Sequence, residues 1–321
     1  MRELTFTAAA REGLAEEMAR DSSIFVVGEG IGARGGNFNT TEGLFALYGP
    51  ERLRDTPISE RGFTGLCTGA AMAGARPVVD YMFFDFALDA LGELINQTAK
   101  IQYMSDGRLT MPIVLRGCIG VGNAAATHHT GAYYPIFTHL PGFRVVVPVT
   151  PRDAKGLLKT AIRSDDPVVF MEHRGLLNTR GPVPEDEELI PFGKARIARA
   201  GKDATVVGIA VMVNKALQAC EVLQSEGVSV EVIDPRTLAP LDIETILESV
   251  HKTGRLLIVD ETYAPCGIGA EIAAQVMARG FDDLDAPVAR LNGAHTPIPY
   301  SPALEAAVVP NPETIAQAIR D

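Results

Sequence analysis

Short apolar runs alternate with longer amphipathic stretches along most of this 321-residue chain. Short continuous apolar runs are typical of strands buried on both faces of a parallel sheet, and the stretches between them are typical of helices that cover such a sheet. For the first half of the chain the pattern predicts helices over 7–20, 65–75 and 85–104, and strands over 23–27, 77–83, 112–116, 143–147 and 167–171.

The pattern changes over residues 178–188, which are polar, acidic and interrupted by proline. Such a composition is typical of a linker that runs over the surface. After this stretch the alternation resumes, and it predicts strands over 204–209, 228–233, 255–259 and 288–291 and helices over 213–226, 242–252 and 267–280. The sequence therefore predicts an α/β fold of two successive doubly wound domains, residues 1–185 and 186–321.

Composition and charge narrow the classes of function. Hydrophobic residues make up 46% of the chain and charged residues 21%, which is enough apolar material for two large cores. The formal net charge is −11. This charge argues against a nucleic-acid partner, because the binding of phosphates needs a concentrated positive surface.

The cysteines and the apolar runs bear on the cellular environment. No CxxC spacing occurs, so we expect neither a zinc site nor a disulfide framework but buried, reduced thiols at Cys67, Cys118, Cys220 and Cys266. The first residues lack the basic start and apolar stretch of a signal peptide, and no run approaches the roughly 20 apolar residues of a membrane span. We therefore expect a cytoplasmic protein without a membrane-spanning segment.

Two clusters near predicted strand ends carry candidate chemistry, whereas the common nucleotide-loop, nucleophile-elbow and zinc-helix motifs do not occur. Residues 55–65 place Glu60 after a proline-stiffened segment and before a helix of small residues, where a carboxylate can also act as a cap. Residues 81–86 are mostly aromatic and follow a strand. Open parallel sheets bind ligands at that end of their strands, and aromatic core packing is the alternative interpretation.

Two further clusters contain titratable side chains. The third is Thr127-His128-His129-Thr130, which lies in a Gly/Ala-rich loop. Because adjacent side chains point in different directions, one catalytic and one structural histidine are more natural than a metal-binding pair. The fourth cluster, residues 260–263, is also explained as a strand-to-helix turn. By themselves these patterns indicate a two-domain α/β protein and no particular reaction.

Taken in order, the clusters resemble the β subunit of the first component of 2-oxo acid dehydrogenases, of the pyruvate, branched-chain and acetoin type. The resemblance covers essentially the whole chain and is carried by the motifs at 55–60, 153–157, 161–163, 167–170 and 297–300. It implies a thiamine pyrimidine-binding domain followed by a domain like the C-terminal domain of transketolases. In that family two α and two β chains assemble, and each active site lies where an α chain meets a β chain.

The chemistry of the family implies roles for residues at matching positions. A carboxylic acid hydrogen-bonded to the pyrimidine ring of thiamine diphosphate favours the tautomer that removes a proton from the thiazolium carbon. Glu60 matches this acid, and Glu29 matches an acidic position of the same buried network. Met82 and Phe86 match positions that pack on the pyrimidine ring, for which an apolar and polarisable wall is well suited.

The histidine loop departs from the family pattern Gln-His-Ser-Gln. Alignment through residues 139–142 places the active-site histidine of the family on His129, while His128 and Gly131 replace the two glutamines. The family histidine contacts the substrate or the acyl acceptor, so we expect His128 to lie near the substrate as well. An additional imidazole suits a hydroxylated or phosphorylated donor.

The resemblance also implies ions and a partner. The motif that holds the diphosphate and magnesium is absent here and belongs to the α subunit, so this chain alone is expected to be inactive. A potassium-binding loop known in some relatives corresponds to Ile113, Ala161, Ile162, Ser164 and Asp166.

Two reactions are compatible with this resemblance. The first is oxidative decarboxylation of a 2-oxo acid, with acyl transfer to the lipoyl group of an acyltransferase that docks on the C-terminal domain. The second is a transketolase-like transfer of a two-carbon unit from a ketose phosphate or 2-oxo acid to a carrier protein or sugar, which the altered histidine loop favours. A purely structural subunit is disfavoured because the residues with implied roles are retained, namely Glu60, Met82, Phe86 and His129.

Overall fold

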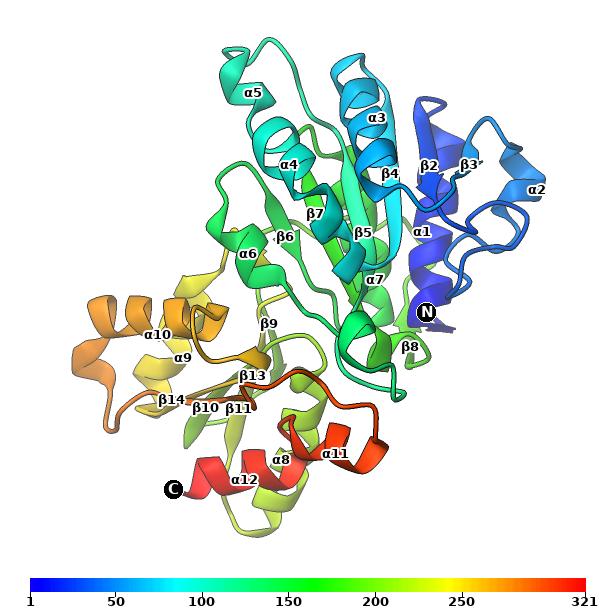
Figure 1. Ribbon diagram of the computed structural model, residues 1–321. Helices are drawn as coiled ribbons and strands as arrows, with labels where there is room; N and C mark the ends of the chain where they lie inside the picture. Colours follow the sequence, from blue (N-terminus) through cyan, green and yellow to red (C-terminus); the bar gives the residue numbers. More distant parts are fainter. The chain divides into compact units, whose positions relative to one another are not determined.

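A parallel sheet forms the centre of the first of two units in the computed structural model, which describes residues 1–321 (Figure 1). This first unit consists of residues 1–119 and 136–192, and the second consists of residues 120–135 and 193–321. The stretch 120–135 therefore groups with the second unit, although it lies between two strands of the first. That stretch contains the histidine loop.

The strands of the first sheet run parallel in the order β6-β7-β5-β4-β2-β3. All except β3 are mostly buried, in line with the apolar runs of the sequence. Their bounds are β2 (Ile24–Gly28), β3 (Leu53–Asp55), β4 (Arg76–Phe83), β5 (Val114–Ile119), β6 (Arg144–Val146) and β7 (Val168–His173). Because the strands are parallel, their carboxyl ends share one edge, where Gly28 is paired with both Asp55 and Asp80.

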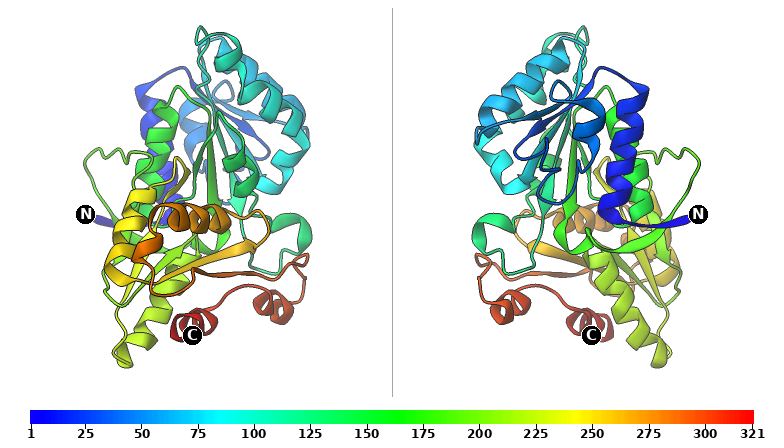
Figure 2. Two further views of the ribbon diagram at one scale, coloured as in Figure 1. Left: turned by 90° about the vertical axis from the view of Figure 1, so that its left-hand side faces the viewer. Right: turned by 90° about the vertical axis from the view of Figure 1, so that its right-hand side faces the viewer.

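Helices cover both faces of this sheet (Figure 2). One face carries α1 (Phe6–Arg20) and α7 (Pro151–Arg163), and the other carries α3 (Glu60–Met72), α4 (Leu91–Glu93) and α5 (Ile101–Met104). Two short helices, α2 (Leu44–Tyr48) and α6 (Tyr134–His139), lie in connections. Threonine caps the two long helices of the first face, because the hydroxyl groups of Thr5 and Thr150 accept from the backbone N–H groups of their first turns.

Two expectations for the first half were wrong. Residues 180–183 form a strand, β8 (Arg180–Val183), that pairs antiparallel with β1 (Arg2–Thr5), so part of the expected linker is bound to the N-terminus. The helix expected over 85–104 is broken into a 3₁₀ helix (Phe84–Ala90), α4, a π turn (Leu94–Thr98) and α5. The Thr98 hydroxyl accounts for the wide turn, since it donates to the Glu93 carbonyl oxygen over 3.2 Å.

The second unit is built on a sheet of order β14-β13-β10-β11-β9. Only β9, which sequence analysis did not predict, runs antiparallel to its neighbour. The strands are β9 (Arg196–Arg199), β10 (Ala204–Gly208), β11 (Val230–Asp234), β13 (Leu256–Tyr263) and β14 (Ala289–Gly293), and a short β12 (Thr237–Ala239) follows β11.

The helices of the second unit also form two layers. In Figure 1, α8 (Met212–Ser225) and α12 (Pro312–Arg320) lie together on one side of its sheet, and α9 (Ile243–Thr253) and α10 (Ile268–Arg279) lie together on the other. A short α11 (Pro302–Ala307) precedes α12. Both units are thus α/β folds with a mainly parallel central sheet, as the sequence predicted.

The structure also bears on the expectations for the cysteines and for membrane-spanning segments. Cys67, Cys118 and Cys220 are buried, but Cys266 is exposed, so the expectation of a buried thiol was wrong at that position. Cys266 lies just before α10 with a φ angle of 56°, in a turn rather than in the core. No helix is both long and apolar enough to cross a membrane.

Candidate active site

Glu60 opens α3 rather than preceding it, so the helix expected over 65–75 begins earlier than predicted. Ser59 occupies the N-cap position, and its carbonyl oxygen accepts from Phe63 N over 3.0 Å. A carboxylate in the first turn is stabilised by the unsatisfied N–H groups of the helix start. The Glu60 side chain is nevertheless buried, with only 8% of the residue exposed.

Glu29 lies directly after β2, at the same sheet edge. Burial raises its pKa, and the nearby charge of Glu60 raises this pKa further. The two chain segments are joined by a hydrogen bond from Thr56 N to the Gly28 carbonyl oxygen, 3.0 Å long. A side chain at Gly28 is excluded, because a Cβ atom there would lie 2.2 Å from the carbonyl oxygen of Asp80. The structure thus brings together the two acidic residues that the sequence singled out.

Met82 has a left-handed backbone, with φ of 64°, at a bulge near the end of β4. For a residue with a Cβ atom this conformation costs about 1 kcal/mol or more. Asp80 stabilises it, because its Oδ1 atom accepts from Met82 N over 2.9 Å. The side-chain amide of Asn37 donates to the Met82 sulfur atom, and Thr40 Oγ1 donates to Asp80 Oδ2 over 2.9 Å. Met82 is therefore held through both its backbone and its side chain.

Asp80 is itself fixed by buried charges on the neighbouring strands. It is paired with Arg116 of β5, whose guanidinium group forms a bidentate ion pair with Glu172 of β7. Against the opposing effect of burial, the charges of Glu172 and Asp80 raise the pKa of Arg116. Breaking a buried pair of this kind leaves an uncompensated charge, so the Arg116–Glu172 pair is expected to stay intact on the strands beside Asp80.

Phe86 follows Met82 by four residues and lies in the 3₁₀ helix after β4. Its ring meets that of Phe83 edge to face, at a centroid distance of 6.2 Å, and Phe83 meets Phe38 in the same way at 5.3 Å. The guanidinium carbon of Arg174 lies 5.2 Å from the centroid of Phe83. The expected aromatic packing is thus present, and the ligand wall at Met82 and Phe86 stays a prediction.

The two histidines lie in the second unit, within a 3₁₀ turn over Thr127–His129. His128 is exposed and His129 is partly exposed. Thr127 Oγ1 donates to the Ile298 carbonyl oxygen over 3.0 Å, and Thr130 Oγ1 donates to the Ala126 carbonyl oxygen over 2.7 Å. Both histidines therefore sit on a loop whose flanks are pinned by threonine.

The loop proposed for potassium is closed by hydrogen bonds of the protein. The carbonyl oxygens of Ile162 and Ser164 accept from Nη1 of Arg76, over 3.1 and 3.0 Å. Ser164 N donates to the Ala161 carbonyl oxygen over 3.2 Å, and Ser164 Oγ donates to that of Asp166 over 3.1 Å. The Arg76 guanidinium group therefore already places a positive charge at this loop. Potassium binding at the loop stays a prediction.

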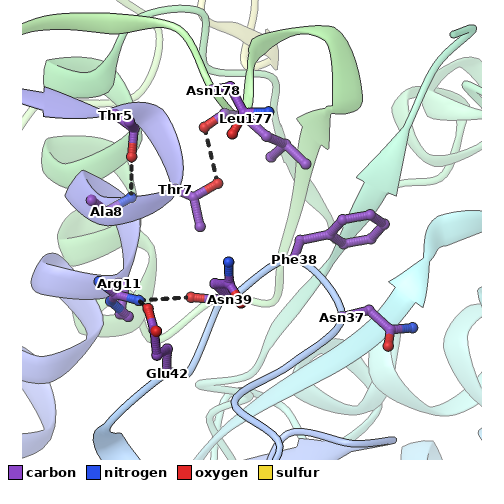
Figure 3. A pocket seen from close by; sticks show the side chains of 10 residues that line it. All are labelled: Thr5, Thr7, Ala8, Arg11, Asn37, Phe38, Asn39, Glu42, Leu177 and Asn178. Carbon is purple, nitrogen blue, oxygen red and sulfur yellow. Dashed lines mark hydrogen bonds and ion pairs between the residues drawn. The ribbon is translucent and has the colours of Figure 1, made fainter. Parts of the chain in front are cut away.

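A polar hollow of about 300 Å³ opens beside the Asn37 loop (Figure 3). Its single arginine, Arg11, pairs with Glu42 and also donates to the Asn39 carbonyl oxygen over 3.3 Å. On the opposite wall Thr7 Oγ1 donates to the carbonyl oxygen of Leu177. Because the charged groups of the hollow are paired with one another, we assign it no ligand.

Comparison with known families agrees with this architecture. Residues 2–180 match the family model described as "Transketolase, pyrimidine binding domain", and residues 193–315 match "Transketolase, C-terminal domain". The β subunit of the pyruvate dehydrogenase E1 component of Rickettsia bellii is 44% identical over 99% of this chain and 98% of its own length. The chain belongs to this β-subunit family. The resemblance inferred from the sequence motifs is thereby confirmed.

One further relative and one solved structure are similar over almost the whole chain. The β subunit of acetoin:2,6-dichlorophenolindophenol oxidoreductase of Cupriavidus necator is 44% identical over 99% of this chain and 97% of its own length. A solved structure titled "Split gene transketolase, inactive beta4 tetramer" superposes with a TM-score of 0.80 over 99% of this chain and 97% of its own, at 22% identity. That level of identity supports the fold alone.

Sequence analysis missed several residues that hold the site. Asp80 was visible only as a single acidic residue within an apolar strand, and Thr40 and Asn37 carried no signal because their partners lie far along the chain. The Thr56 hydroxyl group was also missed; it is buried without a hydrogen-bond partner beside the Glu60 segment. An orphaned polar group at this edge, together with the acidic pair and the Met82 wall, fits a bound heterocycle such as an aminopyrimidine.

Proposed function

We propose that this chain is the β subunit of a thiamine diphosphate-dependent 2-oxo acid dehydrogenase and supplies the acid Glu60 to the cofactor. The observation that carries the proposal is the buried Glu60 carboxyl group at the start of α3, next to Glu29, in a chain whose family is established by full-length similarity. The β subunit of the acetoin oxidoreductase of Cupriavidus necator is similar to this chain over almost its full length and supports the assignment as a β subunit.

The residues of this chain have distinct tasks in the proposed mechanism. When bound, thiamine diphosphate would supply the nucleophilic carbon of the reaction. The Glu60 carboxyl group holds a proton for the pyrimidine ring nitrogen, which is general acid–base catalysis. Glu29 would place a second acidic side chain beside Glu60, and the pKa of Glu29 is raised by burial and, further, by the charge of Glu60.

Met82 and Phe86 would form the wall against the pyrimidine ring. The left-handed backbone of Met82 is fixed by Asp80, so the thioether presents an apolar and polarisable surface without further rearrangement. Such a wall excludes water from the proton on Glu60. We assign His129 to contact with the substrate or acceptor, and the exposed His128 to the approach of the substrate.

The proposal includes partners. Family membership implies an α subunit, and we propose an α2β2 tetramer in which the α chain holds magnesium and the diphosphate group. The acyl acceptor would be the lipoyl group of an acyltransferase. The net charge of −11 favours a docking partner with a basic surface.

The decisive experiment is reconstitution with the α subunit. The purified complex is assayed with 2-oxo acids and, separately, with ketose phosphates, using lipoamide and an electron-accepting dye as acceptors. Reduction of lipoamide with a 2-oxo acid is the expected result. Cleavage of ketose phosphates without turnover of 2-oxo acids would replace this function with the two-carbon transfer reaction.

A further inference from the structure

The loop that carries the histidines has an unusual backbone. Asn123, Ala124 and Ala126 all have φ angles between 52° and 60°, and Gly120 and Gly122 are also in the left-handed half of φ space. Residues with a Cβ atom adopt this conformation at a cost of roughly 1–2 kcal/mol each. Such a loop keeps one conformation only when contacts from outside the loop determine it.

The strongest of these contacts comes from the end of β13. Asp260 is completely buried, and two hydrogen bonds from its own turn orient its carboxylate, from Thr262 N over 3.0 Å and from Thr262 Oγ1 over 2.7 Å. The hydroxyl group of Tyr134, which is also completely buried, donates to Asp260 Oδ1. The two residues are 126 positions apart in sequence.

A second contact supports the other end of the loop. Val121 N donates to Oε2 of Glu261 over 3.4 Å. Adjacent residues of β13 therefore hold both ends of the segment 120–135, and the histidines lie between them. Figure 1 shows β13 inside the sheet of the second unit, between β14 and β10.

Packing alone does not require this arrangement. A buried carboxylate costs several kcal/mol unless it is well hydrogen-bonded, and an apolar pair of similar volume would fill the space without that cost. What the carboxylate adds is direction, because its Oδ1 atom accepts the tyrosine hydroxyl group at one defined position. The Tyr134–Asp260 hydrogen bond lies next to the strained loop that carries the histidines, which indicates that the bond fixes the conformation of this loop.

We propose that Tyr134 and Asp260 are positioning residues that fix the histidine loop and so present the His129 imidazole in a single orientation. This inference rests on the proposed function, since it takes His129 as the residue that contacts substrate or acceptor. It also gives a role to the Tyr133-Tyr134-Pro135 segment, which follows the altered family motif.

The first test is physical and does not depend on activity. Tyr134→Phe keeps the ring and removes only the hydroxyl group, so the fold should be retained. In the complete complex, amide hydrogen exchange of residues 121–132 is expected to become at least about tenfold faster. Tyr48→Phe is the matched control, because its hydroxyl donates to the Ala15 carbonyl oxygen over 3.0 Å in the first unit. Unchanged exchange in Tyr134→Phe would overturn the proposal.

The second test is a double-mutant cycle on turnover of a 2-oxo acid. Tyr134→Phe is expected to lower kcat about tenfold or more without changing the KM for thiamine diphosphate. In a His129→Ala background it should have no further effect, because it acts through His129. Fully additive losses would overturn the positioning role. Full activity of His129→Ala would refute the assignment of His129 in the proposed function, and the exchange experiment would still decide whether Tyr134 anchors the loop.

Discussion

Glu29 and Glu60 lie close enough for the charge of Glu60 to raise the pKa of Glu29, whose burial already raises it. A raised pKa means that Glu29 holds its proton more tightly than a fully hydrated carboxyl group does. The pair comes from two different elements, the loop after β2 and the start of α3.

The coupling can be measured directly. Glu60→Gln removes one of the two causes that raise the pKa of Glu29, so this pKa is expected to fall towards its usual value while remaining raised by burial. NMR titration of the ¹³C-labelled side-chain carboxyl group of Glu29 checks the shift. Glu93→Gln is the control, because Glu93 lies in α4, pairs with Arg61 and does not contribute to the raised pKa of Glu29, so the titration of Glu29 should stay unchanged. An identical Glu29 titration in Glu60→Gln and wild type would contradict the coupling.

The same variant tests catalysis. In the complex with the α subunit, Glu60→Gln is expected to lower turnover at least about a hundredfold, the usual contribution of a general acid or base. The circular dichroism spectrum and the binding of thiamine diphosphate should remain close to those of wild type, since the amide keeps the shape of the side chain. Turnover within a factor of two of wild type would remove Glu60 from the mechanism.

The backbone of Met82 makes a separate prediction. Met82→Gly and Met82→Ala both remove the thioether, but only glycine adopts a φ of 64° without strain. We expect the glycine variant to be more stable than the alanine variant by about 1 kcal/mol, measured by urea unfolding. Both should weaken cofactor binding, because the proposed apolar wall is lost. Equal or reversed stabilities would show that the left-handed conformation is not maintained in solution.

Asp260 should make stability depend on pH. Burial raises its pKa from the ordinary 3.8 to about 6, although the hydrogen bonds from Tyr134 and Thr262 act in the opposite direction. The folded protein therefore binds the proton more tightly than the unfolded chain, and stability falls as the pH rises from about 4 to about 6. Against Asp260→Asn, whose side chain does not titrate, wild type is expected to lose roughly 2–3 kcal/mol over this range. The charged neighbour Glu261 is present in both proteins. Parallel urea-unfolding profiles at pH 4 and 7 would contradict a raised pKa.

Much of the fold could be predicted from the local pattern of apolar and polar residues. Continuous apolar runs marked the central strands of both sheets, because such strands are buried on both faces. The break in the helix expected over 85–104 was not readable, since it depends on hydrogen bonds of one buried threonine, Thr98, to Glu93 and to Thr68. The antiparallel β1–β8 pair joins segments from opposite ends of the first unit, and neither strand is strongly apolar.

Residues of the candidate site could be predicted from the sequence only where they lie in a motif of the family. Glu60 and Glu29 stand in recognisable segments, and the structure places them together. The residues that hold Met82 could not be predicted from the sequence, because Asp80 and Asn37 form their hydrogen bonds to Met82 only in the folded chain. Tyr134 and Asp260 were likewise separated in sequence, and a phenol–carboxylate bond has no local pattern that predicts it.

The assignment of residues 120–135 to the second unit limits how this protein can be divided. A fragment that ends at residue 192 would keep both histidines but lose Asp260, Glu261 and the Ile298 carbonyl oxygen, to which their loop is bonded. If the two halves were expressed as separate polypeptides, the histidine loop would be held by these hydrogen bonds only after the halves had associated. A gene fission at this boundary, although it respects the two family domains, would make ordering of the histidine loop depend on the concentration of the other half.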